Sequence, residues 1–305
     1  MPHTTPYQGR LWLGVALVMA TVFCFAISDV LTKYLTQRYP VTEVIAIRYV
    51  VSFVALFVVA FPNAGSGLWR TKNTKLLIIR GLLMCVGSFT ISYALKVMPI
   101  GETIAIIYIM PFIVIAMSGP FLGEKVSPFG WLMTIFGFSG VLMVLNLSGE
   151  LNTLGVICAL TNAVCIAIFQ IMTRKLVHQD SAVTMLFYVN AGGLVVFSLA
   201  AIPSLDESRL PTLFDGSMMV LLGLIVSSAH FLFARAYKEA PASLLAPINY
   251  VHLVWAALLG WVFFDQFPNN WAIAGICLIL ASGTAMSLHA HFSRKREQLA
   301  AANPR

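Results

Sequence analysis

Two stretches of the sequence resemble each other: residues 81–108 read GLLMCVGSFTISYALKVMPIGETIAIIY, and residues 223–250 read GLIVSSAHFLFARAYKEAPASLLAPINY. At an offset of 142 residues they share Gly, Phe, Ala, Lys, Pro and Tyr, in the pairs Gly81 and Gly223, Phe89 and Phe231, Ala94 and Ala236, Lys96 and Lys238, Pro99 and Pro241, and Tyr108 and Tyr250. An apolar chain repeats Leu and Val by chance, but Lys, Pro, Gly and Tyr at one offset indicate an internal repeat.

The repeat continues upstream at an offset of 141 residues, where Leu13-Gly14-Val15 matches Leu154-Gly155-Val156 and Pro62 matches Pro203. Thr32-Lys33 likewise matches Thr173-Arg174. We therefore divide the chain into a short N-terminal tail (1–10), a first copy (11–149), a second copy (150–291) and a basic C-terminal tail (292–305).

Composition indicates that both copies lie in a membrane. Of the 305 residues, 59% are hydrophobic and 10% are charged, whereas soluble domains carry about 25% charged residues. Nine charge-free stretches are each long enough to cross a bilayer, which takes ~20 apolar residues: 11–28, 49–69, 103–123, 126–149, 151–173, 181–205, 216–234, 240–264 and 266–293. Leu76–Leu95 makes a tenth if Arg80 snorkels to the interface. Buried helices of a large soluble protein are a remote alternative, because these stretches leave no polar faces for water.

Each copy holds five predicted spans, and an odd number places the second copy upside down relative to the first. The predicted fold is an all-α integral membrane protein, with ten transmembrane helices arranged as two inverted five-helix repeats around a central cavity. Inverted repeats are typical of transporters that work by alternating access.

Basic residues set the orientation. With the N-terminus inside, 14 of the 19 Lys and Arg residues fall on the cytoplasmic side, as the positive-inside rule expects. Both chain ends are then cytoplasmic, and the net charge of +7 reports topology, not nucleic-acid binding. The first apolar run has no small-residue cleavage site followed by a polar chain, so we interpret it as a retained span.

No cofactor, metal site or catalytic centre is expected. The five cysteines lie inside apolar stretches without a CxxC pair: Cys24, Cys85, Cys158, Cys165 and Cys277. This pattern argues against a disulfide framework and a zinc site. His230 and His252 have no acidic third ligand nearby in the sequence.

The chain resembles the EamA branch of the drug/metabolite transporter superfamily over nearly its whole length. The residues that carry the resemblance are Tyr93-Ala94-Leu95, Pro99, Pro111, Gly123-Glu124-Lys125 and Gly140-Val141 in the first copy, and Ala236, Pro241 and Pro247 in the second. Asp265-Gln266 depart from the Gly-Glu expected there. The resemblance is greatest to bacterial exporters of aromatic and neutral amino acids. It implies a ten-helix secondary carrier of the bacterial inner membrane.

Polar residues on one helix face are candidates to bind substrate. Ser88 and Ser92 share a face with Gly81, and Ser227 and His230 share the equivalent face with Gly223. Small and polar residues on a span serve either close packing or a water-filled path. We expect packing for the glycines and the cavity for the serines and His230, although serines also bond to their own helix.

The ninth span adds Asn249, Tyr250 and His252 to the candidate site, and Tyr93 and Tyr108 are expected in its apolar wall. Pro111 and Pro247 are predicted helix breaks, because proline removes one backbone hydrogen bond; simple kinks are the alternative. His230 or His252 could carry a coupling proton, since imidazole titrates near neutral pH. The alternative is a neutral histidine held by hydrogen bonds.

Three charged residues near the outer ends of spans, Asp29, Arg48 and Glu102, are predicted to form an outer gate or vestibule. Asp29 and Lys33 are spaced to pair on one helix. Interfacial snorkelling is the alternative for all of these charges.

Together these features predict a carrier that exports amino acids, aromatic ones included, or similar small metabolites. Its partners would be that small-molecule substrate, the lipid bilayer and, as coupling ion, protons, with no nucleic acid. A facilitated-diffusion carrier and an exporter of drugs are alternatives. An intramembrane lipid-modifying enzyme is a remote one, since it needs clustered carboxylates, a metal set or an activated nucleophile.

Overall fold

The computed structural model describes residues 11–122, 128–147, 151–176, 179–204, 210–239, 245 and 248–302. Helices make up nearly all of this described part, which contains no strand: α1 (Leu11–Thr36), α2 (Val41–Ala64), η1 (Gly65–Leu68), α3 (Thr74–Val97), α4 (Ile100–Ile107), α5 (Met110–Leu122), α6 (Pro128–Leu147), α7 (Thr153–Leu176), α8 (Ala182–Ala201), η2 (Ile202–Ser204), α9 (Leu213–Glu239), α11 (Val251–Phe264) and α12 (Asn270–Ala302). Gly123-Glu124-Lys125, Pro241 and Pro247 lie outside the described residues.

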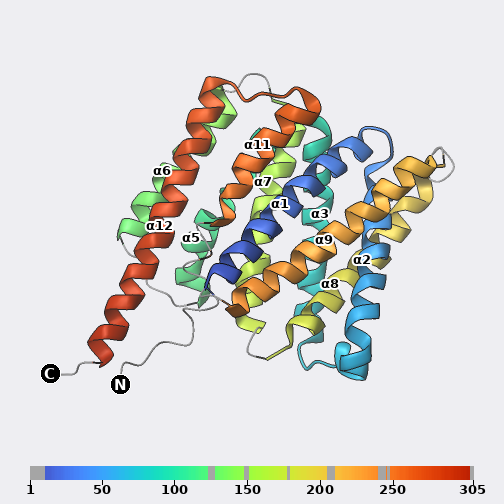
Figure 1. The fold of residues 1–305 in the computed structure, drawn as a ribbon, viewed down its shortest axis with the longest axis horizontal. Helices are drawn as coiled ribbons and strands as arrows, with labels where there is room; N and C mark the ends of the chain where they lie inside the picture. The colour runs from blue at the N-terminus through green and yellow to red at the C-terminus, as the bar shows by residue number, and fades with distance from the viewer. Residues whose placement is uncertain are drawn as a thin grey trace.

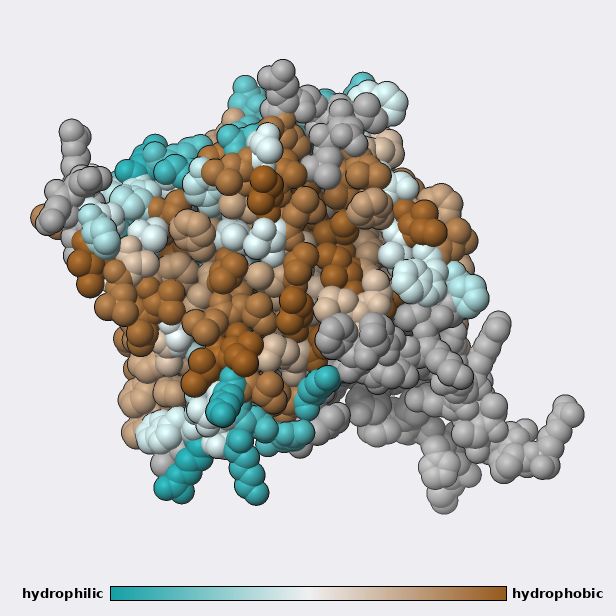
Figure 2. Space-filling model, turned by 180° about the vertical axis from the view of Figure 1, so that it is seen from behind, coloured by the Kyte–Doolittle hydropathy of each residue, from teal (hydrophilic) through white to brown (hydrophobic). Residues whose placement is uncertain are grey.

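The predicted ten-helix membrane fold is confirmed. Eight helical segments of the described chain are long and apolar enough to span a bilayer, and α4 with the start of α5 forms one of them. α6 and α11 supply two shorter apolar helices, Pro128–Val144 and Val251–Phe264. Apolar residues cover the middle of the surface in Figure 2, and polar residues gather toward its upper and lower ends. This distribution suits a hydrocarbon environment.

The two ends of the helical chain lie at the same end of the bundle. α1 begins, and α12 finishes, at the lower end in Figure 1. A chain that crosses a bilayer an even number of times begins and ends on the same side. α12 continues to Ala302, so much of the segment that we assigned to a separate tail extends the last helix.

The helices pack in a pattern that is unchanged when the two copies are exchanged. α1 packs against α9 and, equivalently, α7 packs against α3; α2 meets α8, α4 meets α11 and α6 meets α12. The rings of Tyr108 and Tyr250, which are equivalent in the repeat, lie 5.2 Å apart. Such self-complementary contacts are those of a two-fold arrangement.

Glycines allow two equivalent close helix contacts, as predicted for them. A Cβ atom on Gly81 would lie 3.1 Å from the carbonyl oxygen of Tyr188, and one on Gly223 would lie 3.1 Å from that of Arg48. Small residues at such positions let helix backbones approach closely.

The fourth and ninth spans are irregular at equivalent positions. α4 finishes at Ile107 and α5 begins at Met110, which leaves Tyr108 and Ile109 outside both helices. Pro111 lies in the first turn of α5, and α11 begins directly after Tyr250. Irregular backbone at membrane depth occurs where it is buried in protein or lines a cavity.

Equivalent hydrogen bonds join the two halves at the opposite ends of α2. At one end, which we call the Asp215 cluster, Tyr39 donates to Asp215 at 2.8 Å. At the other, the Asp180 cluster, Asn73 donates to Asp180 at 2.9 Å. Tyr39 is equivalent to Asp180 and Asn73 to Asp215 in the repeat. The hydrogen bond to Asp215 also raises the pKa of the Tyr39 phenol above its ordinary value.

Two basic side chains are placed differently from the prediction. Lys33 does not pair with Asp29; it is 2% exposed and donates to the carbonyls of Leu95 at 2.8 Å and Met98 at 2.6 Å. These carbonyls close the C-terminal end of α3, where cations are favourable. Arg80 is buried against other helices and donates to Thr173 of α7 at 2.8 Å.

Lys33→Met is expected to lower the melting temperature of the purified protein. Methionine keeps an apolar side chain of similar length but leaves both carbonyls without their donor, and hydrogen bonds to charged groups contribute about 1.5–3 kcal/mol. Lys75→Met, at an exposed position of α3, is the control. Equal melting temperatures for both variants would contradict this role of Lys33.

Candidate functional site

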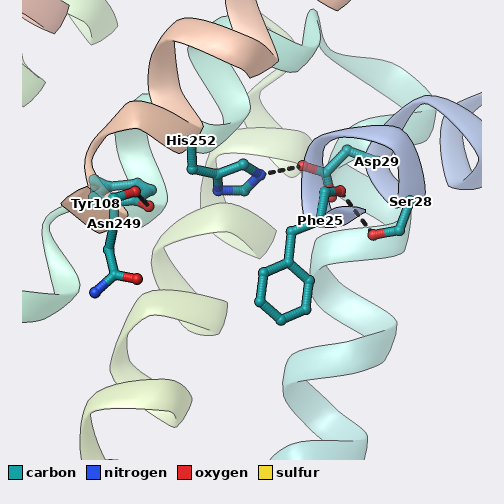
Figure 3. Close-up of polar contacts among 6 residues, drawn as sticks. All are labelled: Phe25, Ser28, Asp29, Tyr108, Asn249 and His252. Atoms are coloured by element: carbon teal, nitrogen blue, oxygen red, sulfur yellow. Dashed lines mark hydrogen bonds and ion pairs between the residues drawn. The ribbon is translucent and has the colours of Figure 1, made fainter. Parts of the chain in front are cut away.

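A buried acidic residue and a histidine connect the two halves at the centre of the candidate site. His252 Nε2 of α11 lies 2.9 Å from Asp29 Oδ2 of α1, and the two side chains are 13% and 8% exposed. Figure 3 shows the imidazole aimed at the carboxylate, between Tyr108 and α1. The pair forms a hydrogen bond that either protonation state of the histidine supports.

Aromatic groups surround this pair. Phe25 precedes Asp29 by one turn of α1, and its ring centroid lies 5.4 Å from that of His230 and 6.3 Å from that of His252. The ring of Tyr108 lies 6.0 Å from His252. The structure therefore brings both predicted histidines to the same aromatic residue, one from α9 and one from α11.

The break in the fourth span is tied to the ninth span. The Tyr108 hydroxyl donates to the backbone carbonyl of Asn249 at 2.6 Å, and Tyr250 is buried. The side-chain amide of Asn249 donates to the carbonyl of Leu245 at 3.5 Å. Three of the predicted substrate residues thus meet where both copies are irregular.

A second polar group, from α2 and α3, lies around Tyr49. Its hydroxyl is 2.8 Å from Ser88 Oγ, and its ring stacks on Phe197 of α8 with centroids 5.5 Å apart. Ser92, one turn beyond Ser88, is 1% exposed and its hydroxyl has no hydrogen-bond partner. Tyr93 packs at the edge of the same cluster.

Ser227 differs from the other candidates, because its hydroxyl donates to the carbonyl of Gly223 on its own helix at 2.9 Å. This is the back-bonding that serines adopt in helices.

The predicted outer network of Asp29, Arg48 and Glu102 is not assembled as one cluster. Asp29 contacts His252, and the guanidinium of Arg48 lies 4.9 Å from the ring centroid of Tyr49. Glu102 is buried near Lys33, and its Oε2 atom has no hydrogen-bond partner. Among the described residues, no ion pair joins any two of the three.

Charge placement distinguishes the half-buried Arg48 from the buried Lys33 and Arg80. Lys33 and Arg80 donate to acceptors on neighbouring helices, whereas Arg48 has no carboxylate within ion-pair distance in the described part of the chain. Charged residues inside spans are rare, because they are costly to insert. Among the described residues, the partner of the Arg48 guanidinium is therefore the ring of Tyr49 and not a carboxylate.

No group of three or more His, Cys, Asp or Glu side chains that could hold a metal occurs within the described ranges. The predicted central cavity stays a prediction. A groove of about 390 Å³ runs instead along the outer surface between α2 and α9, lined by apolar side chains: Val50, Val51, Val54, Ala55, Val58, Val59, Val220 and Leu224.

Sequence reasoning missed Phe25 and Tyr49, and it assigned Asp29 to a gate. An acidic residue inside a span was a visible signal for Asp29, because such residues face the bundle interior and pair with a partner. No signal marked Phe25 or Tyr49, since aromatic residues are common in this chain.

Comparison with known proteins identifies the family. Residues 12–146 and 153–288 each match the EamA-like transporter family. The chain belongs to this family. An EamA chain is a transporter, not an enzyme, and the two matched segments coincide with the two copies that pack across the two-fold arrangement.

Several curated EamA relatives are similar over most of the chain. The S-adenosylmethionine uptake transporter of Rickettsia bellii is 28% identical, over 88% of this chain and 91% of its own. The pseudopaline exporter of Pseudomonas aeruginosa is 25% identical, over 90% and 95%. The riboflavin transporter of Vibrio cholerae is 26% identical, over 91% and 92%. All three carry small molecules, and none is named for amino-acid export.

A solved crystal structure shares the fold. It aligns with a TM-score of 0.64 and 20% identity, over 92% of this chain and 98% of that chain. At this identity the likeness supports the EamA architecture alone.

Proposed function

We propose that this protein is a secondary transporter of small metabolites that carry an amino-acid group, and that it works by alternating access between its two inverted halves. The Asp29–His252 contact carries the proposal, because it is a buried polar link between the halves. It lies beside the one place where the repeat-equivalent tyrosines touch. A solute bound there would contact both halves at once.

Aromatic and polar side chains, which could contact different parts of a substrate, lie around the Asp29–His252 contact. Phe25, Tyr108 and Tyr250 supply aromatic faces, which suit a flat ring and tolerate smaller groups. His230 and Asn249 supply polar groups beside the link, and Ser88 and Ser92 supply hydroxyls in the second polar group, around Tyr49. Aromatic amino acids fit this description, and export is the direction that the resemblance implies.

A second candidate substrate is S-adenosylmethionine. Relatives named for its uptake match 88–90% of this chain. S-adenosylmethionine joins a flat adenine ring to the amino-acid group of methionine, so it presents the same two features as an aromatic amino acid in a larger molecule.

Proton coupling is part of the proposal and is assigned to Asp29 with His252. A proton taken up or released by this pair changes its net charge in a low-dielectric environment, where such changes alter contact strength most. Because the pair joins the two halves, its protonation would bias the equilibrium between their arrangements. Residence in the inner membrane with both ends cytoplasmic is proposed from the distribution of basic residues.

Transport by purified protein in proteoliposomes tests the proposal. Labelled L-phenylalanine, S-adenosylmethionine and riboflavin are offered separately. Saturable uptake of at least one of the first two, with counterflow and with competition by the L-form over the D-form of phenylalanine, is expected. Flux that does not saturate and shows no counterflow would indicate a pore and overturn the proposal.

A further inference from the structure

Arg48 lies in the first third of α2 and packs against a neighbouring helix. It is the eighth residue of α2 (Val41–Ala64), which places it about 10 Å along the helix at 1.5 Å per residue. Its backbone carbonyl contacts Gly223 on α9, and its guanidinium lies 4.9 Å from the ring centroid of Tyr49. The half-buried side chain therefore lies beside Tyr49.

The surroundings of Arg48 provide polar groups but no negative charge. Glu43, which lies earlier on α2, is not within ion-pair distance, and neither is any other carboxylate among the residues described above. Tyr49 and Ser88 share a hydrogen bond at 2.8 Å, and the buried hydroxyl of Ser92 has no partner. A cation without a carboxylate, near hydroxyl groups of which one has no partner, has the composition of an anion site.

We infer that Arg48 binds the carboxylate of the transported metabolite, with the Ser88 and Ser92 hydroxyls beside it. The guanidinium presents paired N–H donors that match the two oxygens of a carboxylate. With the carboxylate at Arg48, the remainder of the substrate would extend toward His230 and His252. Phe25 and Tyr108 lie beside these two histidines. This inference rests on the proposed function and assigns recognition of the substrate's carboxylate to one side chain.

Paired compounds that differ only in the carboxylate test the inference. The probes are S-adenosylmethionine against its decarboxylated analogue, and L-phenylalanine against L-phenylalaninamide. Ligand-induced rise of the melting temperature measures binding without requiring transport. Wild-type protein is expected to bind the carboxylate member of a pair at least tenfold more tightly than the other member.

Arg48→Gln is expected to remove this preference, so that both members of the pair bind with similar affinity. Arg48→Lys is expected to retain part of it, because lysine keeps the charge without the planar fork. Arg70→Gln, at an exposed position between α2 and α3, is the matched control. The melting temperature of each variant without ligand shows whether it is folded.

The outcomes separate the inference from the proposed function. If wild-type protein transports one of the probes and Arg48→Gln still prefers the carboxylate as strongly as wild type, Arg48 is not its binding residue. If wild-type protein neither binds nor transports any probe, the proposed substrate class itself is wrong, and the inference fails with it.

Discussion

Asp29→Asn is expected to abolish transport driven by a pH gradient while exchange of substrate across the membrane continues. Asparagine has the size of aspartate and can still accept a hydrogen bond from His252, but it cannot take up a proton. One pH unit corresponds to a free energy of about 1.36 kcal/mol, which is a factor of about ten in a concentration ratio. If one proton moves with each substrate, a gradient of one pH unit therefore supports about tenfold accumulation. Accumulation ratio with and without the gradient is the measurement.

The coupling assignment has a matched control and a companion variant. Asp265→Asn changes an exposed carboxylate at the end of α11, where the residue has φ 55°, a conformation that asparagine tolerates. It is expected to behave like wild type. His252→Gln is expected to behave like Asp29→Asn. Gradient-driven accumulation that survives both Asp29→Asn and His252→Gln would rule out this pair as the coupling site.

Gly275→Val is expected to prevent α6 and α12 from packing, and to reduce strongly the yield of folded, monodisperse protein. A Cβ atom on Gly275 would lie 2.6 Å from the carbonyl oxygen of Gly140, and one on Gly140 would lie 2.8 Å from that of Gly275. Both obstacles are backbone atoms, which cannot rotate away. Overpacking of this kind costs typically about 1–3 kcal/mol, and the two helices must separate to relieve it.

Gly192→Val in α8 is the control for this substitution. It introduces the same branched residue into another membrane-spanning helix, but a Cβ atom there has no neighbour within 4 Å. Size-exclusion profile and melting temperature in detergent compare the two variants. If Gly275→Val is as stable as Gly192→Val, the close contact between α6 and α12 does not limit stability.

The ten spans and the repeat were predictable from the sequence, because bilayer thickness sets the length of apolar segments and a duplicated unit keeps Gly, Pro and Tyr at one offset. Tyr108 and Tyr250 could be matched as equivalent residues in this way. Their direct contact could not be predicted, since it depends on how the two copies are placed around their common axis.

The partners of the charged side chains were much harder to predict. Asp29 and His252 are separated by 223 positions, and their contact depends on the rotation of α1 and α11 about their own axes. Lys33 follows Asp29 by one turn, which made a local pair plausible, yet α3 ends beside Lys33 and its carbonyls provide the nearer acceptors. Local spacing gives no information about such neighbours from another helix.

The two hydrogen-bonded end clusters allow the most direct test of alternating access. In protein whose native cysteines are replaced, cysteine pairs at Tyr39 and Asp215, and separately at Asn73 and Asp180, can be joined by thiol cross-linkers of graded length. If the halves open at each end in turn, cross-linking either pair stops transport in proteoliposomes, and cleaving the linker restores it. Full transport with the Asp215 cluster cross-linked, or with the Asp180 cluster cross-linked, would contradict the account.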